Sequence, residues 1–188
     1  MVLAGGAARR LGGQDKPGLS VGGRTLVQHV VAAGREAGAR RVMVVGPSRP
    51  ELDDVLFVPD EQQGPVAALR QGLPHVRAPR VALLAADLPF LRARHIRALL
   101  EAVTGTGAVL ADEQGREQWL TGCWRTAALN DALTQYPGKS LHGLLGPLRP
   151  RLVTITAEPG EPPPWLDCDT PDDIERARRL ASGDDVPG

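Results

Sequence analysis

The sequence predicts an α/β domain in which a mostly parallel central sheet lies between two layers of helices. Short apolar runs alternate along the chain with longer segments of helical periodicity, which is typical of βαβ units. The length of 188 residues suits one domain with a substantial core, and the 42% hydrophobic content argues against a disordered chain. We expect the domain to span 1–182 and a polar tail to occupy 183–188.

The expected strands and helices follow one another in an alternating order. Strands are expected at Val2–Ala4, Arg41–Gly46, Val55–Val58, Val81–Ala85, Ala108–Ala111 and Leu152–Thr156. Helices are expected at Thr25–Ala37, Pro65–His75, Arg92–Val103, Arg125–Gln135 and Pro171–Ala181. Glu117–Trp124 is a further candidate strand, which could run antiparallel to its neighbours, and Gly22-Gly23 predicts a tight turn.

Charge and cysteine content exclude several classes of function. Lys plus Arg and Asp plus Glu each number 22, so the zero formal charge does not support a general role on nucleic acid or on a membrane surface. No apolar run approaches the ~18 residues of a membrane helix, and the chain start lacks the pattern of a signal peptide. Cys123 and Cys168 lack metal-ligand spacing, so we expect reduced thiols in a cytoplasmic protein. The histidines are scattered and do not suggest a metal site.

Polar features follow four of the predicted strands at the point where each strand ends. They are the glycine-rich loop after the first strand, Asp60, Asp87, and the pair Asp167 and Asp169. In open parallel sheets, ligands bind outside the carboxyl ends of the strands. The sequence therefore predicts a binding site at this edge of the sheet.

The opening loop, LAGGAARRLGGQDK at residues 3–16, has the properties of an anion site. Its glycines let the backbone turn sharply and present N–H groups to a ligand. Arg9, Arg10 and Lys16 add positive charge. These properties favour a cradle for a polyphosphate, while a plain β–α turn with solvated basic side chains is the alternative.

Two common phosphate-binding motifs are excluded. The Gly-Lys-Ser tripeptide at 138–140 has Leu133 where a Walker A loop requires glycine. The run Gly-Gly-Ala-Ala at 5–8 does not supply the Gly-x-Gly-x-x-Gly pattern of dinucleotide-binding loops. The loop must therefore belong to another class.

A signature of short runs distinguishes this loop: Leu3-Ala4-Gly5-Gly6, Arg10, Gly12-Gly13 and Asp15-Lys16. Later positions extend it with Asp60, Gly64-Pro65, Asp87-Leu88-Pro89 and Asp169-Thr170-Pro171. The pattern resembles nucleotidyltransferases of the nucleotide-diphospho-sugar transferase fold, and more narrowly the molybdenum cofactor guanylyltransferase family. This resemblance implies a three-layer α/β/α, Rossmann-like fold and transfer of GMP from GTP to molybdopterin carrying molybdenum, with release of pyrophosphate.

The resemblance also implies the partners and the compartment. They are GTP, molybdopterin and Mg²⁺ in the cytoplasm, without nucleic acid or membrane, and could include transient contact with proteins that deliver the cofactor or mature molybdoenzymes. A related nucleotidyltransferase using CTP or another phosphate acceptor is one alternative. A nucleotide-binding module without chemistry is another, although Lys16 and Asp87 favour an enzyme.

Roles carried over from the resemblance concentrate on the loop and the sheet edge. Lys16 would hold the GTP phosphates, and Arg10 would support the attacking phosphate or the departing pyrophosphate; with Asp87 they form the catalytic set. Nucleotide contacts would come from Leu3, Ala4, Gly5, Gly6, Lys16, Gly46, Asp60, Gly64 and Asp87. An ordinary turn carboxylate is the alternative for Asp60. Gly46 stands where the family can carry Asn, so only its backbone could contact nucleotide.

Asp87 and Asp169 are the candidate metal ligands. A carboxylate at the end of an apolar strand is unfavourable unless it is paired or bound to a cation. Mg²⁺ prefers one or two carboxylates together with phosphate oxygens and water. Capping of the next helix is the alternative for Asp87. Asp169 could bind the same ion, cap the helix that begins at Pro171, or do both.

The segment Gln118–Cys123 departs from the family, which usually has Pro-Leu here. By resemblance this segment would face the pterin substrate. Trp119 or Trp124 could stack on a pterin ring, and packing in the core is the alternative for each. The acceptor is thus the part of the reaction that the sequence supports least.

Overall fold

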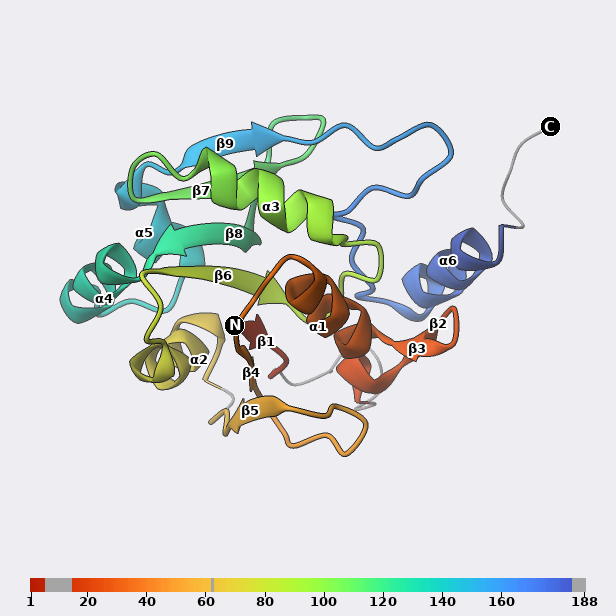
Figure 1. Ribbon diagram of the computed structural model, residues 1–188, viewed down its shortest axis with the longest axis horizontal. Coiled ribbons are helices and arrows are strands. Elements are labelled where there is room, and N and C mark those ends of the chain that lie inside the picture. The colour runs from red at the N-terminus through yellow and green to blue at the C-terminus, as the bar shows by residue number, and fades with distance from the viewer. Residues whose placement is uncertain (6–14, 62, 184–188) are drawn as a thin grey trace.

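The computed structural model describes residues 1–5, 15–61 and 63–183, and its centre is one twisted sheet (Figure 1). Within these residues seven strands pair in the order β5-β4-β1-β6-β8-β7-β9. Their bounds are β1 Val2–Leu3, β4 Val42–Val45, β5 Val55–Val58, β6 Arg80–Ala85, β7 Gly107–Ala111, β8 Glu117–Arg125 and β9 Arg151–Thr154.

The sheet is mostly parallel, as expected. β1 pairs in parallel with β4 and β6, β4 with β5, and β7 with β9. β8 is antiparallel to both β6 and β7, which confirms the further strand at Glu117–Trp124 and its direction. Since β1, β4, β5 and β6 run the same way, their carboxyl ends meet at one edge, where the predicted site lies.

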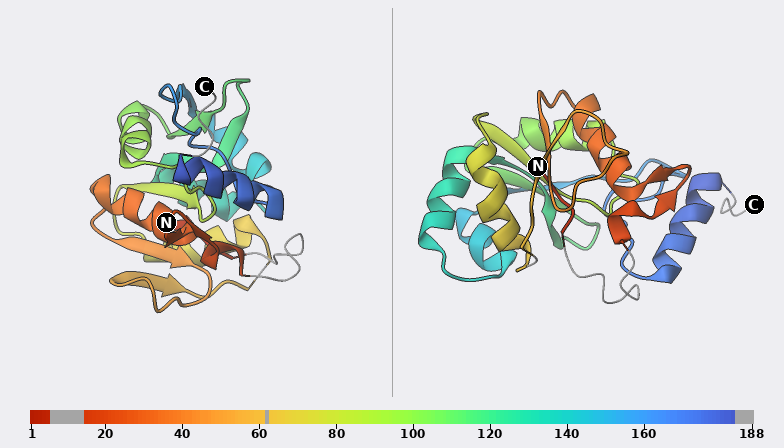
Figure 2. Two further views of the ribbon diagram at one scale, coloured as in Figure 1. Left: turned by 90° about the vertical axis from the view of Figure 1, so that its right-hand side faces the viewer. Right: turned by 90° about the horizontal axis from the view of Figure 1, so that it is seen from below.

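Helices cover both faces of the sheet and complete the three layers (Figure 2). α1 (Leu26–Glu36) and α3 (Ala93–Ala102) pack on one face through a core cluster that includes Val30, Ile96 and Leu99. On the other face lie α2 (Pro65–Gly72), α4 (Thr126–Gln135) and α5 (Leu141–Leu145). The predicted α/β/α architecture is therefore confirmed.

A hairpin and the last helix form a smaller unit beside the sheet, at the right of Figure 1. β2 (Ser20–Val21) and β3 (Arg24–Thr25) are antiparallel, and α6 (Pro171–Ser182) packs on β2 through a small apolar cluster. Gly22 and Gly23 form the predicted tight turn with φ of 56° and 80°, values that side-chain-bearing residues rarely adopt. This unit brings the end of the chain close to the segment that follows the opening loop.

The expected strands and helices are present with ends shifted by a few residues, and two differences have local causes. The helix expected at Pro65–His75 is α-helical only to Gly72, and Leu73–His75 continues as a 3-10 turn with Pro74 inside it. α5 was not expected. It has five residues, is capped by the Ser140 hydroxyl, which accepts from Gly143 N, and is too short for a periodic signal.

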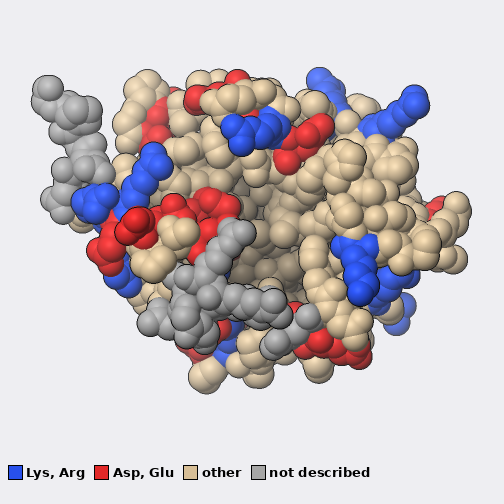
Figure 3. All heavy atoms as spheres, turned by 180° about the vertical axis from the view of Figure 1, so that it is seen from behind, with Lys and Arg blue, Asp and Glu red and all other residues tan. Residues whose placement is uncertain are grey.

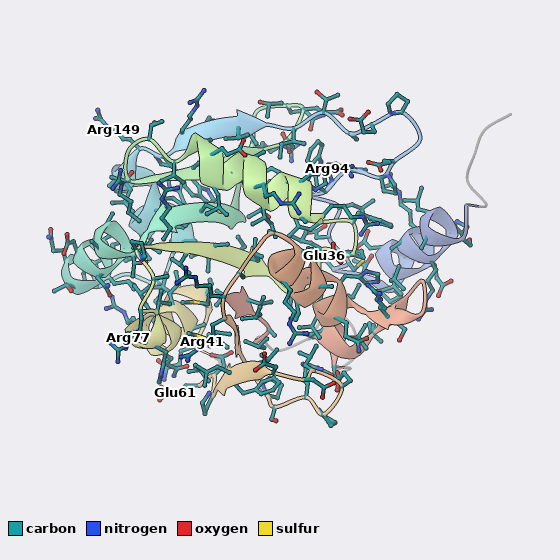
Figure 4. The ribbon with its side chains drawn as sticks, viewed as in Figure 1. Glu36, Arg41, Glu61, Arg77, Arg94 and Arg149 are labelled. Carbon is teal, nitrogen blue, oxygen red and sulfur yellow. The ribbon has the colours of Figure 1, made fainter. Side chains whose placement is uncertain are left out.

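A cavity of about 840 Å³ opens at the opposite edge of the sheet, where the strands begin. Its lining includes Val42 and Arg80 at strand starts, and Arg41 and Arg77, which Figure 4 labels beside α2. None of the described residues predicted to form the site lines this cavity.

No helix in the described ranges has the length and apolar content of a membrane span.

His95 links the stability of α3 to pH. It is 4% exposed, and its Nδ1 accepts the Arg92 N–H at 3.1 Å, so the first turn of α3 requires an unprotonated Nδ1. Burial and then the charge of Arg94 lower the pKa of His95 from 6.5 to about 4. Because the unfolded chain binds this proton more readily, the free energy of unfolding should fall by up to about 3 kcal/mol as pH drops from 6.5 to 4.

Urea unfolding of His95→Gln between pH 7 and pH 4.5 tests this coupling. The variant should lose part of the pH dependence, while replacement of the exposed His75 by Gln should leave it unchanged. Equal slopes in wild type and His95→Gln would assign the pH dependence to other groups.

Candidate active site

The ends of β1, β4 and β5 come together around the first glycine of the opening loop. A Cβ on Gly5 would lie 1.5 Å from Asp60 Oδ2, so the Asp60 carboxylate rests directly on the Gly5 backbone. Gly46 has a φ of 154°, and a Cβ there would lie 3.0 Å from the carbonyl carbon of Ala4. Leu3 and Ala4 are buried in the sheet. The structure thus gathers these five predicted nucleotide-binding residues at one point.

Gly64 opens the next element at the same edge. It is the N-cap of α2 with a φ of 96°, and Pro65 takes the first helical position. A Cβ on Gly64 would meet nothing within 4 Å, so the constraint on this position is conformational and its backbone faces open space. The first N–H groups of a helix have no partners within the helix, which lets them contact a ligand at this end.

Lys16 lies between two carboxylates from distant parts of the chain. Its Nζ donates to Asp87 Oδ2 at 2.5 Å and also to Asp169 Oδ1. Asp87 follows β6 by two residues, whereas Asp169 precedes α6. The side chains of Lys16, Asp87 and Asp169 are 17%, 21% and 43% exposed, so the cluster is partly shielded but open on the Asp169 side.

The charges in this cluster are strongly coupled. Burial alone would lower the pKa of Lys16, but attraction to Asp87 and hydrogen bonds to both carboxylates outweigh it and raise the pKa above its ordinary value. Burial, and then the nearby Asp169 and Asp87 carboxylates, raise the pKa of Asp167. Lys16 therefore stays charged, and among the described residues the carboxylates of this cluster outnumber the cations, which favours binding of a further cation.

The capping alternatives for both metal candidates are wrong. The N-cap of α3 is Arg92, so Asp87 caps no helix. The cap of α6 is Thr170, whose hydroxyl accepts from Asp173 N while the Asp173 carboxylate accepts from Thr170 N at 2.8 Å. Neither carboxylate is the N-cap of the helix that follows it, and both bond to Lys16.

Asp169 reaches the site by a route that differs from the expectation. β9 ends at Thr154, two residues early, and residues 155–170 contain no helix or strand. This segment is tied to α3 by an ion pair between Arg94, labelled in Figure 4, and Glu161. Asp169 is therefore placed by the start of α6 and not by the end of a strand.

The paired carboxylates fit the requirements of Mg²⁺. Among the described residues no three His, Cys, Asp or Glu side chains gather in a way that could hold a metal by themselves. Asp87 and Asp169 nevertheless both bond to the Lys16 ammonium, so their oxygens converge on one cation. Two carboxylates suffice when phosphate and water supply the remaining ligands.

Cys123 and Cys168 are free and buried, and burial raises the pKa of each thiol to about 12.

The two tryptophans considered for stacking on a pterin have different environments. Trp124 is fully buried in the core, so the stacking alternative is wrong for it. Trp119 is half-buried and meets the His142 ring edge-on, with centroids 5.6 Å apart and an interplanar angle of 84°. Because Thr121 pairs with Leu84, Trp119 lies further toward the edge at which β6 ends.

Arg49 is a contact residue that sequence reasoning missed. It follows β4, is 5% exposed, and forms an ion pair with Asp15 of the opening signature. The sequence offered one signal for this contact. Arg49 lies shortly after the end of a predicted strand, between Gly46 and Pro50. Gly6, Arg9, Arg10 and Gly12-Gly13 lie outside the described residues.

The space-filling view (Figure 3) shows where acidic side chains gather on one face of the molecule. In Figure 3 acidic side chains gather beside a hollow on the side of the molecule where α6 lies. The described carboxylates that interact with Lys16 are Asp87, Asp169, Asp167 and Asp173. A phosphate ligand would need cations to enter here, and Lys16 provides one of them.

The fold and this edge define a nucleotidyltransferase. The chain belongs to the family described as the MobA-like NTP transferase domain, whose model matches residues 1–152. It is 34% identical to the molybdenum cofactor guanylyltransferase of Xanthomonas euvesicatoria pv. vesicatoria (strain 85-10), over 94% of this chain and 92% of that protein. It is 30% identical to the enzyme of that name from Bradyrhizobium sp. (strain ORS 278), over 98% and 93%.

A solved structure supports the same fold. The homologue of Mycobacterium tuberculosis rv0371c from Mycobacterium sp. strain JC1 superposes with a TM-score of 0.76 at 26% identity. The alignment covers 97% of this chain and 94% of that one, so the similarity extends through α6 as well as the sheet.

Proposed function

We propose that the protein is a cytoplasmic guanylyltransferase that transfers GMP from GTP to the terminal phosphate of molybdopterin carrying molybdenum. The products would be the guanine dinucleotide form of the cofactor and pyrophosphate. The observation that carries the proposal is Lys16 held by Asp87 and Asp169, beside the glycine-lined end of β1. Relatives that carry the name molybdenum cofactor guanylyltransferase over nearly their whole length support the choice of nucleotide and acceptor.

The reaction joins two anions, so the protein has to neutralise charge and hold the reacting groups in line. Lys16 would exchange its carboxylate partners for the GTP phosphates. Its raised pKa means that it arrives as an ammonium at neutral pH. No covalent intermediate on the protein is needed, because phosphate attacks phosphate directly.

Asp87 and Asp169 would hold Mg²⁺ once Lys16 turns to the phosphates. The ion, when bound, would supply positive charge to the α-phosphate and to the leaving pyrophosphate. Asp87 is the better-shielded ligand, and Asp169 is more open to solvent. The two oxygens already face one cationic point, so the exchange requires motion of the lysine side chain more than of the carboxylates.

The nucleoside would lie over the ends of β1, β4 and β5. Backbone groups at Gly5, Gly46 and Gly64 could reach base or ribose closely, and the Asp60 carboxylate could accept from their N–H or hydroxyl donors. On the other side, Trp119 with His142 offers an aromatic wall for a flat bicyclic acceptor such as a pterin.

Incubation with each of the four NTPs, Mg²⁺ and molybdopterin, with mass analysis of the product, tests the proposal. A guanine dinucleotide product and stoichiometric pyrophosphate would support it. A cytosine product would leave the class of enzyme intact and change the nucleotide. Nucleotide binding without release of pyrophosphate would indicate a binding module.

The second candidate is a related nucleotidyltransferase that uses CTP or another phosphate acceptor. It is favoured by Gly46, since no side chain at this position can select the base. The departure from the family at Gln118–Cys123 likewise leaves the acceptor open to other phosphates.

The nucleotide preference gives a direct prediction. By calorimetry with Mg²⁺, GTP should bind about 10-fold more tightly than CTP, a difference of about 1.4 kcal/mol. ATP and UTP serve as further references in the same titration. Equal affinities for GTP and CTP, or a preference for CTP, would contradict the guanylyl assignment and leave the fold assignment unchanged.

A further inference from the structure

A buried arginine holds one end of the opening loop by a two-bond fork. Arg49 Nη1 donates to Asp15 Oδ2 and Nη2 donates to Asp15 Oδ1, each at 2.6 Å. The hydrogen bonds from Arg49 lower the pKa of Asp15, so this carboxyl is ionised at neutral pH. A guanidinium–carboxylate fork fixes orientation as well as distance, which a single ion pair does not.

The surroundings leave the pair little freedom. A Cβ on Gly18 would lie 2.4 Å from Asp15 Oδ2 and 3.3 Å from Arg49 Nη1, so glycine makes room for the fork. Arg49 Nε is buried and has no hydrogen-bond partner in the described part of the chain. The guanidinium is therefore held by the fork with Asp15 and by a longer ion pair in which Nη1 lies 3.7 Å from Glu51 Oε1.

The segment after β4 touches both ends of the opening loop. At its start, Gly46 packs against the Ala4 carbonyl carbon, as described above. At its end, Arg49 binds Asp15, the residue directly before Lys16. Asp15 is also the N-cap of the short 3-10 helix Lys16–Gly18, and its carbonyl accepts from Gly18 N at 3.0 Å. The position of the Lys16 backbone is therefore set from β4.

We propose that Arg49 is a positioning residue, which acts through Asp15 to fix the backbone from which Lys16 reaches the nucleotide phosphates. The role rests on the proposed function, since Lys16 is the group being placed. Arg49 itself touches neither substrate nor the reacting phosphorus. Displacement of a charged group by about 1 Å can lower a rate on the order of 10²-fold. If Asp15 were not held in place, Lys16 would shift and turnover would fall.

The lysine content of the chain allows a test that does not depend on turnover. Lys16 and Lys139 are the two lysines of the sequence, and Lys139 is exposed. Acetylation by an N-hydroxysuccinimide ester, followed by peptide mass spectrometry, reports both rates in one sample. Without nucleotide, Arg49→Met should raise the labelling of Lys16 relative to Lys139 several-fold. Arg116→Met, which removes a surface ion pair with Asp112 at the β7–β8 turn, is the matched control and should leave this ratio unchanged.

Turnover and a double-mutant cycle complete the experiment. Arg49→Met should lower kcat on the order of 10²-fold with the acceptor KM unchanged. Asp15→Asn should have a smaller effect of the same kind, since the amide oxygen can still accept from Arg49, and its melting midpoint should fall because the buried guanidinium loses its nearest charged partner. The double variant should be no worse than Arg49→Met, because Arg49→Met already removes the fork that Asp15→Asn weakens.

The outcomes separate this inference from the proposed function. Wild-type labelling of Lys16 in both Arg49→Met and Asp15→Asn would overturn the positioning role. Additive losses in the double variant would also overturn it. If wild type transfers no nucleotide, the proposed function fails, while the labelling rates still decide whether Arg49 places Lys16. If Arg49→Met does not fold, Asp15→Asn and Arg49→Lys, which keeps the charge but loses the fork, supply the same comparison.

Discussion

Lys16→Ala should lower turnover by about 10²–10³-fold and leave the fold intact, the loss expected for one strong electrostatic donor. The side chain lies in a short 3-10 turn and supports no core packing, so unfolding is not the expected cause. The variant should also bind Mg²⁺ more tightly than wild type in the absence of nucleotide. The reason is that Asp87 and Asp169 would lose the ammonium between them and would be left as adjacent carboxylates.

Initial rates and magnesium titrations of the apo-protein measure both effects. Lys139→Ala, a change at the exposed lysine, is the control for loss of charge and should match wild type in both. Near-normal turnover in Lys16→Ala would make Lys16 an ordinary surface residue. Unchanged magnesium affinity would show that the carboxylates do not form the metal site.

Asp87→Asn should lower turnover by at least about 10²-fold, the scale of lost electrostatic stabilisation at a phosphate. Asparagine keeps the shape of the side chain and removes its charge. Asp169→Asn should lower turnover less, because Asp169 is 43% exposed against 21% for Asp87. An isolated carboxylate at an apolar strand end would be destabilising, but Asp87 is paired with Lys16. We therefore expect its replacement to lower apo stability slightly, by up to about 1 kcal/mol.

Rates across a magnesium titration and melting midpoints of the apo-proteins test these expectations. Asp131→Asn, on the exposed side of α4, is the control and should change neither. If Asp87→Asn keeps its activity with the same magnesium requirement, the metal binds elsewhere. If the variant unfolds, the Asp87–Lys16 pair is chiefly a structural contact.

The layers of the fold were predictable because each layer has a local signal. Buried strands such as Val42–Val45 are continuous apolar runs, and α1 begins at a capping box formed by Thr25 and Gln28. Asp87 became a candidate for a similar reason, since a carboxylate that ends an apolar run is visible in the sequence alone. Its proximity to Lys16 followed from the rule for parallel sheets.

The parts that escaped prediction depend on contacts between distant residues. Nothing local to Arg49 says that its guanidinium meets Asp15, 34 positions earlier. The approach of Asp169 depends on α6 packing against β2, which no pattern between 155 and 170 records. α5 was missed because five residues are too few for a period to show.

The pairing of Lys16 with Asp169 has a consequence for biosynthesis, because the two residues are 153 positions apart. While the chain emerges from the ribosome, the strands through β6 can pair, and Lys16 can meet Asp87. Asp169 can join them only after the residues of α6 have also been made and this helix docks on β2. A nascent chain that ends before α6 therefore carries Lys16 and Asp87 but lacks the second carboxylate of the proposed metal site.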